Sequence, residues 1–511
     1  MTEFAPGQLN AARRAQEIEA LAGRDLVDVL VVGLGVTGAG VALDAASRGL
    51  DVLAVDAHDL AHGTSRWSSK LVHGGLRYLA KAQFGVAYES AVERGILLQT
   101  TAPHLTRPLP MLLPALPSVA PAALTIAAAG FRAGDGLRLS ARTPRSLLPR
   151  PRGLSATEAR AMATGVRSEG LRGGVLAWDG QLEDDARLVV ALARTAATHG
   201  ASILTRMRVT ETGEAGEVAL RDELTGEDHV VRARVIVNAA GVWASALQPE
   251  VALRPARGTH LVFEGERFGH PTTALTLPIP GESNRYLLVL PQPDGRVYVG
   301  LTDVDAPGPI PDVPEPSEEE ISELLDVLGV LYDDPPQRED VRGAFAGLRP
   351  LLDSGEEGRT ADLSRAHLVH RGRGPMVTIV GGKLTTYRKM AEDAVDAAVI
   401  EGALTAGPCV TRTLPLVGAL PREQLEAVDA PQRLVGRYGS EAPLVVSGDP
   451  ALAEPVSGGL PYTPDELRFA VTHEGALDAG DILDRRTRIG LVAEDRAAAS
   501  SAAAAALDAE L

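Results

Sequence analysis

A glycine-rich turn between a buried strand and a helix constrains the fold of this chain more than any other feature. Residues 28–32 (DVLVV) are typical of a buried strand, and Gly33, Gly35 and Gly38 follow as G-x-G-x-x-G. The first glycine permits the tight turn, the second lets the backbone approach a pyrophosphate, and the third lets the helix pack on the strand. The helix N-terminus then faces the phosphates with its partial positive charge. The pattern predicts a dinucleotide-binding unit within an α/β fold.

An acidic residue at the end of the next strand supports this prediction. Residues 51–55 (DVLAV) predict a second short strand, and Asp56 follows it. Its distance from Gly38 is close to the ~20 residues expected of a carboxylate that binds an adenosine ribose. A carboxylate there suits a free 2′-hydroxyl and disfavours the 2′-phosphate of NADP. A chance glycine turn would explain the glycines alone, but not the strand, helix, second strand and acid together.

Two further strand-to-glycine turns lie far downstream. Residues 231–244 (VRARVIVNAAGVWA) predict a strand that enters a turn of small residues, where Ala240 and Gly241 would lie against a ligand; an ordinary strand end is the alternative. Residues 377–389 (VTIVGGKLTTYRK) predict a strand, a glycine pair and a helix whose N-terminus would face an electron-rich ring. The candidate cofactor contacts of this last turn are Gly382, Lys383, Leu384 and Thr385. Three dispersed turns suit an extended FAD better than NAD on one compact domain.

Seven segments carry a more specific pattern. They are SSKLVHGGLRYL (68–79), WDGQLEDDARLV (178–189), NAAGVW (238–243), RGTHLVF (257–263), VGLTDVD (299–305), GLRPLLD (347–353) and VGGKLTTYRKMAE (380–392). In this order they resemble the FAD-dependent glycerol-3-phosphate dehydrogenase family, and the resemblance spans residues 26–500. It implies that sn-glycerol 3-phosphate is oxidised to dihydroxyacetone phosphate by hydride transfer to FAD, with electrons passed to a membrane quinone.

The resemblance also implies which residues form the site. Oxidation of a secondary alcohol needs a base for the hydroxyl proton, and a phosphate group needs cations, guanidinium groups above all. His260 and His73 are the two candidate proton acceptors, and the sequence leaves the choice open. Arg349 and Lys383 are expected near the reacting oxygen and the flavin, and both are expected to bind substrate. The other expected contacts are Arg77, Tyr78 and Arg365 for the substrate, and Ser68, Ser69 and Lys70 for the cofactor.

Each of these residues has an ordinary structural explanation. A histidine after a strand is usually a hydrogen-bonded structural residue, and a single arginine is usually a surface charge. Arg349 departs from this expectation because residues 344–352 are largely apolar, and an unpaired guanidinium is costly to bury. We therefore expect Arg349 to have an anionic partner, which is either a protein carboxylate or the ligand.

Composition limits the class of protein. The chain has 511 residues, of which 45% are hydrophobic, so it can form two or three domains with large cores. A net charge of −17 argues against a nucleic-acid surface, because lysine and arginine supply most of the affinity for phosphate backbones. The single cysteine, Cys409, excludes an intramolecular disulfide and offers no thiolate cluster for zinc or iron–sulfur, so we expect no metal site. We expect a cytoplasmic protein, because the polar N-terminus does not resemble a signal peptide.

The pattern of elements predicts three domains. We expect an α/β, Rossmann-like FAD domain of the two-dinucleotide-binding type, an antiparallel-sheet substrate domain and a helical C-terminal domain. The FAD domain must be discontinuous, because its three glycine turns are far apart in the sequence. The expected boundaries are 1–24 for an N-terminal helical extension, 25–105, 170–250 and 340–405 for the FAD domain, 106–169 and 251–339 for the substrate domain, and 406–511 for the helical domain. We expect a homo-oligomer, namely a dimer.

Residues 108–152 are the part of the chain whose pattern suggests contact with a membrane. Residues 108–131 carry no charge, but five prolines break most of the stretch and leave only 122–131 as a helix. Such a helix would be about 15 Å long against a hydrocarbon core of about 30 Å. Six arginines follow between residues 132 and 152, opposed only by Asp135. The stretch 108–152 could therefore seat shallowly in an anionic leaflet, peripherally at the inner face of the plasma membrane. The alternative is a proline-rich loop beside a solvated basic face.

Three other functions stay open on sequence alone. A glycerol-3-phosphate oxidase would pass electrons to oxygen and form hydrogen peroxide; the shared motifs do not separate it, although the chain length disfavours oxidases with insertions. A soluble NAD enzyme would lack a flavin absorption band. A non-catalytic flavin-binding regulatory protein would keep the fold without turnover, but the retained charged and histidine residues disfavour it.

Overall fold

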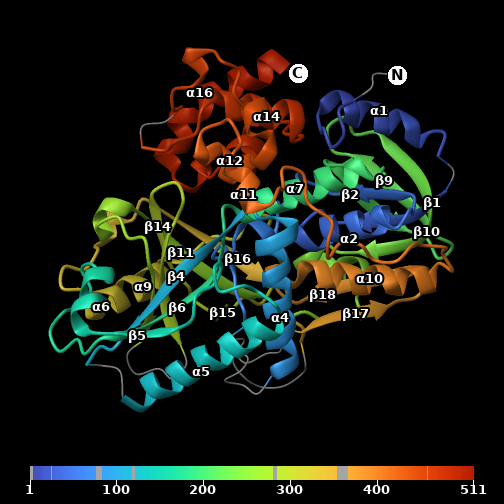
Figure 1. Cartoon of the computed structure of the whole chain (residues 1–511). Coiled ribbons are helices and arrows are strands. Elements are labelled where there is room, and N and C mark those ends of the chain that lie inside the picture. The colour runs from blue at the N-terminus through green and yellow to red at the C-terminus, as the bar shows by residue number, and fades with distance from the viewer. Residues whose placement is uncertain are drawn as a thin grey trace.

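Two β-sheets and a helical C-terminal region make up the fold, as Figure 1 shows. The computed structural model describes residues 4–24, 26–75, 83–117, 121–279, 285–353, 366–456 and 459–510. In the view of Figure 1 one sheet lies to the right, the other to the left, and the red C-terminal helices lie above them. The predicted fold class, an α/β cofactor domain with an antiparallel-sheet domain and a helical C-terminal domain, is confirmed.

The first sheet has eight strands and holds all three glycine turns. Its order is β17-β18-β10-β1-β2-β7, and the hairpin of β8 and β9 extends from β10. β1 pairs in parallel with β10, and β10 with β18, in the registers Val32↔Asn238 and Asn238↔Thr378. Because parallel strands end at the same edge of a sheet, the three turns lie side by side. The strands are β1 (Val27–Val32), β2 (Val52–Val55), β7 (Ser202–Leu204), β8 (Met207–Thr212), β9 (Glu217–Asp222), β10 (Asp228–Asn238), β17 (His367–Arg371) and β18 (Met376–Gly381).

Helices cover this sheet on both faces. α2 (Val36–Ser47) lies between α7 (Asp185–Thr198) and α10 (Tyr387–Glu401), and these helices share one apolar core with the sheet. α2 approaches α10 at Gly40, where an added Cβ would lie 3.0 Å from the ring of Tyr387. α1 (Ala11–Leu21) packs on a second core formed by other side chains of β1 and β2. This burial explains why these strands read as nearly continuous apolar runs.

The second sheet has ten strands and is mainly antiparallel. Its order is β15-β11-β14-β13-β12-β4-β6-β3, with β16 paired to β11 and β5 to β6. α9 (Glu318–Leu331) packs on it and begins at a capping box formed by Ser317 and Glu320. The strands are β3 (Leu71–Val72), β4 (Thr106–Pro114), β5 (Arg152–Leu154), β6 (Gly174–Leu182), β11 (Ala256–Glu264), β12 (Ala274–Pro278), β13 (Tyr286–Pro291), β14 (Arg296–Gly300), β15 (Val304–Asp305) and β16 (Gly343–Arg349).

Three strands of the second sheet come from ranges that the sequence assigns to the FAD domain. β3, β6 and β16 lie within 25–105, 170–250 and 340–405 respectively, yet all three pair inside the second sheet. A short apolar run indicates a strand but not the sheet that it joins. As a result, the chain passes between the sheets close to the glycine turns, and residues next to those turns also contact the second sheet.

Residues 108–114 form a strand, so the alternative of a proline-rich loop there is wrong. β4 pairs with β6 along its whole length. Ala115 donates its N–H to Gly173 O, so the backbone N–H groups of the odd-numbered residues of this strand point toward β6. The backbone nitrogens of the prolines at 108, 110 and 114 point away from β6. On the far side only two residues of β4 pair with β12. The prolines therefore occupy positions where a missing N–H removes little of the ladder.

The segment after β4 is more helical and less basic at its surface than the sequence suggests. α5 (Pro121–Ser140) is longer than the predicted helix at 122–131. Arg138 is buried and donates to Asp135 and to the carbonyl of Thr143, so it is not a surface cation. Arg152 pairs with Glu158 at 2.8 Å. Among the described residues no helix is long and apolar enough to cross a membrane.

Buried ion pairs attach the helical C-terminal region to the first sheet. Arg486 donates to both carboxylate oxygens of Asp59 at 2.6 and 2.8 Å, and Arg187 of α7 pairs with Glu474 at 2.6 Å. The helices of this region are α11 (Arg422–Leu425), α12 (Gln432–Tyr438), α13 (Ala442–Val445), α14 (Pro464–His473), α15 (Ala479–Asp481) and α16 (Ala493–Glu510). The remaining α-helices described are α4 (Phe84–Ile96), α6 (Ala156–Met162) and α8 (Ala244–Leu247).

Candidate active site

The first glycine turn has the geometry that a dinucleotide cradle needs. Gly33 has φ +97°, and a Cβ there would lie 2.8 Å from Ala239 O of the neighbouring turn. A Cβ on Gly38 would lie 1.7 Å from Gly33 O, so only glycine lets α2 begin so close to β1. Gly35 is the N-cap of α2 and brings no capping side chain. The N–H of Val36, the first residue of this helix, donates to Ser65 Oγ at 2.8 Å, and the positive end of the helix dipole faces the turn.

Asp56 lies directly beside this turn. Its Oδ2 accepts the N–H of Leu34 at 2.6 Å, and its Oδ1 accepts the N–H of His58 at 2.8 Å. Burial raises the pKa of this carboxyl above its ordinary value, and the two backbone donors oppose that shift. The carboxylate thus holds the loop after β2 against the glycine turn, where the sequence analysis expects a ribose contact.

The second and third turns continue the same edge. Asn238 donates to Ala244 O at 2.9 Å and accepts the N–H of Ala240 at 3.2 Å, which fixes the turn before Gly241 (φ +58°). In the third turn Gly382 has φ +69°, and a Cβ there would lie 2.4 Å from Met390 Sδ. Gly33, Gly241 and Gly382 all have positive φ, a conformation that favours glycine, so the three turns share this backbone feature.

Lys383 and Thr385 connect the third turn to the segment that carries His73. Lys383 Nζ donates to Ser90 Oγ of α4, and Thr385 Oγ1 accepts the N–H of His73 at 3.3 Å. His73 Nδ1 in turn accepts the N–H of Gly75 at 3.3 Å. His73 is half-buried and lies at the end of β3. This places His73 and Lys383 on neighbouring segments at the edge of the cofactor sheet.

Two residues outside the expected set hold the His73 segment in place. Asp179 of β6 accepts the N–H of Gly74 at 3.0 Å and pairs with Arg94 of α4 at 2.6 Å. Both side chains are buried. The signal in the sequence is an acid in the middle of an otherwise apolar strand, which is costly to bury without a cationic partner. Arg77, Tyr78 and Arg365, which the sequence analysis assigns to substrate, lie outside the described residues.

The segment 64–70 lies against one face of the second sheet. Thr64 Oγ1 donates to Leu348 O at 2.6 Å, and the Trp67 ring stacks on Phe345 with centroids 5.8 Å apart. Ser69 Oγ lies 2.9 Å from His260 Nε2. A Cβ added at Gly347 would lie 2.6 Å from Trp67 Cβ, so this face is kept flat where the segment crosses it.

Lys70 anchors this segment through a buried ion pair. Its Nζ donates to Asp185 Oδ1 at 2.7 Å and to Arg66 O at 2.6 Å, and its backbone has φ +58°, unusual for a residue with a side chain. Ser68 Oγ donates to the other oxygen of Asp185 at 2.7 Å. Burial lowers the pKa of Lys70, and the Asp185 carboxylate opposes that shift. Lys70 therefore positions Ser68 and Ser69, and Asp185 is a residue that sequence reasoning did not assign.

His260 is enclosed on the second sheet. It stacks on Phe345 with centroids 4.9 Å apart and is 1% exposed. Burial lowers its pKa to about 3, and the positive charges of Lys70 and Arg349 act in the same direction. Its Nδ1 has no hydrogen-bond partner within the described part of the chain. His260 is therefore a neutral imidazole near pH 7, and its Nδ1 is buried.

Arg349 lies on the same face as His260, four residues along β16 from Phe345. Its Nη1 donates to Asp303 Oδ1 at 3.1 Å, and its Nη2 donates to Thr302 O at 3.4 Å. The expected anionic partner is thus a protein carboxylate. A Cβ added at Gly258 would lie 2.3 Å from Arg349 Nη2, so the guanidinium occupies the space above a glycine. Asp303 falls within the family-like segment 299–305 but was not assigned a role from the sequence.

The structure therefore divides the expected residues into two groups. His260 and Lys70 lie against Phe345 on the second sheet, Ser69 contacts His260, and Arg349 lies on the same face. His73, Lys383 and Thr385 gather beside α4 at the third glycine turn. The loops 64–70 and 71–75 are continuous in the chain and connect the two groups. A cationic, histidine-bearing face thus lies next to a cradle for a dinucleotide, an arrangement suited to hydride transfer coupled to proton transfer.

Comparisons with known proteins agree with the fold and the cradle. Residues 28–388 match the family of FAD-dependent oxidoreductases, and residues 409–511 match the C-terminal domain of alpha-glycerophosphate oxidase. The chain is 53% identical over 498 residues to glycerol-3-phosphate dehydrogenase 1 of Mycobacterium tuberculosis, covering 96% of each chain. It is 34% identical over 538 residues to a mitochondrial glycerol-3-phosphate dehydrogenase of Arabidopsis thaliana, covering 95% of this chain and 83% of that one.

A comparison with a solved structure agrees with these sequence comparisons. The glycerol-3-phosphate dehydrogenase from Bacillus halodurans, complexed with FAD, matches with a TM-score of 0.75 at 28% identity, covering 98% of this chain and 94% of that chain. The three glycine turns and Asp56 fit FAD, because they place glycine backbone and a carboxylate along one edge of the parallel sheet. The chain belongs to the FAD-dependent glycerol-3-phosphate dehydrogenase family, and FAD is its cofactor.

Proposed function

We propose that the protein oxidises sn-glycerol 3-phosphate to dihydroxyacetone phosphate and passes the electrons to a membrane quinone. The observation that carries the proposal is the placement of a neutral, buried His260 and the guanidinium of Arg349 on one face, beside the FAD cradle. The relatives named as glycerol-3-phosphate dehydrogenases cover nearly the whole chain, which supports the same substrate.

Arg349 would bind the anionic substrate. A guanidinium presents several N–H donors in one plane and can bind phosphate or a polarised oxygen with two hydrogen bonds. Asp303 and the carbonyl of Thr302 accept hydrogen bonds from Arg349 and orient its guanidinium. Lys383, which is held by Ser90, would add a second positive charge at the FAD edge.

His260 would accept the hydroxyl proton. A neutral imidazole carries a lone pair on one nitrogen, and Ser69 beside Nε2 fixes the orientation of the ring. A phosphate group nearby favours the protonated imidazole and raises its pKa toward the range in which histidine works as a base. FAD, when bound, supplies the acceptor for the hydride. Phe345 and Trp67 exclude water from this face, which protects the proton transfer.

FAD would lie along the three turns and the segment 64–70. Gly33, Gly35, Gly38 and Asp56 would hold its adenosine and pyrophosphate end. Its ring end would contact residues of the other two turns and of the segment after Trp67. These are Ser68, Ser69, Lys70, Ala240, Gly241, Gly382, Lys383, Leu384 and Thr385.

The electron acceptor can be tested directly. The enzyme is reduced with glycerol 3-phosphate without oxygen and is then mixed either with a soluble quinone analogue or with oxygen, while flavin absorbance is followed. Rapid reoxidation by the quinone and slow reoxidation by oxygen are expected. Faster reoxidation by oxygen, with stoichiometric hydrogen peroxide, would identify an oxidase instead.

Peripheral membrane contact would use the face around α5. Arg132, Arg142, Arg145 and Arg150 are exposed there. Exposed arginines attract anionic lipid headgroups, and salt weakens that attraction. Co-sedimentation with anionic vesicles should therefore exceed that with neutral vesicles and should fall as salt is added. Failure to bind anionic vesicles even at low salt would exclude this contact.

A further inference from the structure

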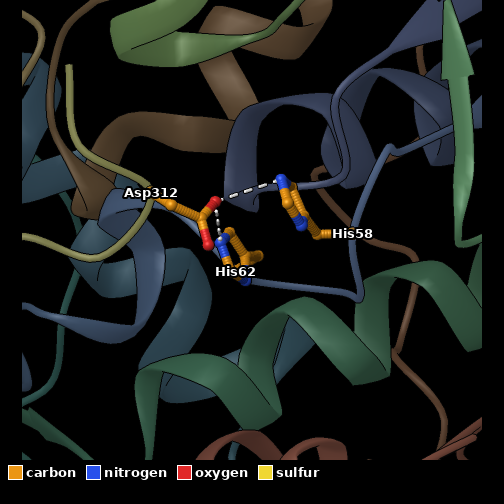
Figure 2. A group of neighbouring side chains, drawn as sticks. All are labelled: His58, His62 and Asp312. Atoms are coloured by element: carbon orange, nitrogen blue, oxygen red, sulfur yellow. Dashed lines mark hydrogen bonds and ion pairs between the residues drawn. The ribbon is translucent and has the colours of Figure 1, made fainter. Parts of the chain in front are cut away.

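Two histidines and an aspartate meet beside the cofactor sheet (Figure 2). Asp312 Oδ1 lies 3.1 Å from His62 Nε2 and 3.2 Å from His58 Nε2. One donor atom from each residue lies within 4.8 Å of the other two. Figure 2 shows the carboxylate approaching both imidazoles from a different segment of the chain. Imidazole nitrogen and carboxylate oxygen are donor atoms that zinc takes in proteins.

Hydrogen bonds fix the backbone on which the two histidines sit. The N–H of His58 donates to Asp56 at 2.8 Å, and its carbonyl accepts the N–H of Arg206 at 2.8 Å. The carbonyl of His62 accepts Arg66 Nε at 3.0 Å. Ligands that are already held in place lose little conformational freedom when an ion binds. The backbones of two of the three ligands are therefore fixed, and the third ligand comes from an exposed loop.

We propose that His58, His62 and Asp312 bind a divalent first-row transition-metal ion, such as Zn²⁺. Three protein ligands leave a fourth position of a tetrahedral site for water. Two imidazoles disfavour Mg²⁺ and Ca²⁺, which take oxygen ligands. A chain with one cysteine gave no reason to expect a metal, but this cluster uses no thiolate. It is also invisible as a sequence motif, because His62 and Asp312 are 250 positions apart.

The spacing of the donor atoms suits such an ion. Zinc bonds of about 2.0–2.1 Å in a tetrahedron keep neighbouring ligand atoms about 3.4 Å apart. The Nε2–Oδ1 distances of 3.1 and 3.2 Å are close to that value. The two imidazoles are stacked, with centroids 3.9 Å apart and planes at 11°. Lone pairs in parallel rings do not meet at one point, so binding turns one ring about its Cβ–Cγ bond, which is a soft torsion.

The three ligands differ in their exposure to solvent. The His62 side chain is 11% exposed and that of His58 is 34% exposed. Asp312 is 65% exposed, so the site is open to solvent on one side and an ion can enter.

An ion at this position would join the two sheet regions. His58 and His62 follow Asp56 at the end of β2, whereas Asp312 lies in the connection between β15 and α9. A ligand that binds only the folded form stabilises it, and one that joins two segments also restricts their separation. Binding of this ion does not depend on which substrate or electron acceptor the protein uses.

Zinc binding to the FAD-loaded chain tests the proposal. The chain, free of any affinity tag, is stripped with EDTA, dialysed against zinc chloride and analysed for bound metal. One zinc ion per chain is expected. Asp312→Asn keeps the shape of an exposed side chain but removes its charge, and His62→Gln removes an imidazole; each should weaken zinc binding by about 100-fold. The matched control is His199→Ala, which removes an exposed histidine at the end of α7 and should bind zinc as the wild type does.

A stability measurement on the same samples separates this site from adventitious binding. Zinc should raise the midpoint of thermal unfolding of the wild type and of His199→Ala, but not that of Asp312→Asn. FAD content equal to that of the wild type shows that Asp312→Asn is folded. The proposal is overturned if the wild type binds no zinc, or if both site variants bind it as tightly as the wild type.

Discussion

Ser69 Oγ and His260 Nε2 lie 2.9 Å apart, and this contact joins the segment after the first glycine cradle to the face of the second sheet. Ser69 is placed by its neighbours, because Ser68 and Lys70 both bind the buried Asp185. His260 is placed by its stack on Phe345. The proposed proton acceptor is therefore fixed relative to the FAD cradle by residues of both sheets, and small shifts between the sheets would change its position.

Replacing Arg349 with alanine should impair substrate use while FAD stays bound. Hydrogen bonds to charged groups contribute about 1.5–3 kcal/mol, so kcat/KM should fall about 10- to 150-fold. FAD content is measured by absorbance, and flavin reduction is measured by stopped flow. Arg254→Ala is the control, since Arg254 pairs with Asp305 on the same sheet in a more exposed setting. Loss of FAD with normal turnover after reconstitution would contradict the role given to Arg349.

Paired variants should identify the proton acceptor. His260→Gln should lower the rate of flavin reduction by about 10²–10⁴-fold, because a general base contributes roughly this factor. His73→Gln should lower it less, since His73 binds the backbone of its own loop through Gly75. Single-turnover reduction without oxygen measures the step in isolation. A larger loss in His73→Gln than in His260→Gln would reverse the assignment.

The Lys70–Asp185 pair should be a strong determinant of stability. Lys70→Met leaves a buried carboxylate without its cation, which costs about 3–5 kcal/mol in comparable buried pairs. The variant should therefore unfold at lower temperature and retain less FAD. Adding Asp185→Asn removes the unpaired charge and should restore part of the loss. A double variant that is less stable than Lys70→Met alone would show that the pair acts differently.

Buried neutral histidines predict the direction of the pH dependence of stability. Burial, with Arg187 and Arg422, lowers the pKa of His104 to about 3, against about 6.5 in an unfolded chain. Between these values the unfolded state binds the extra proton, so the free energy of unfolding falls as the pH falls below about 6.5. At pH 5 this costs about 2 kcal/mol for one such group. His104→Gln should therefore lose less stability than the wild type between pH 7 and pH 5 in urea titrations. An equal loss in both chains would contradict this contribution.

Local patterns predicted the elements of the cofactor sheet well. The glycine turns, the acid at Asp56 and the strands before them follow from short-range rules on turns, helix starts and apolar runs. Such rules do not predict which sheet β3, β6 and β16 join. They also do not predict the strand β4. In β4 the prolines indicate a loop by composition, and only the one-sided pairing of the strand makes them compatible with a sheet.

The sequence predicted which residues belong to the site, but it did not predict which residues pair with them. The apolar setting of Arg349 required an anion, yet Asp303 could be identified only from the folded chain. The same holds for Asp185 under Lys70 and for Asp312 beside His62, since each pairs across more than one hundred positions. Such pairs depend on which strands become neighbours, and that choice is made by tertiary packing rather than by local propensity.

Oxidation of sn-glycerol 3-phosphate by this FAD enzyme can be observed in an anaerobic titration of the purified, FAD-loaded protein with glycerol 3-phosphate. The oxidised flavin band is the signal. We predict that the band bleaches as substrate is added and that dihydroxyacetone phosphate forms in equal amount. An unchanged flavin spectrum at saturating glycerol 3-phosphate, in protein that dithionite still reduces, would contradict the claim.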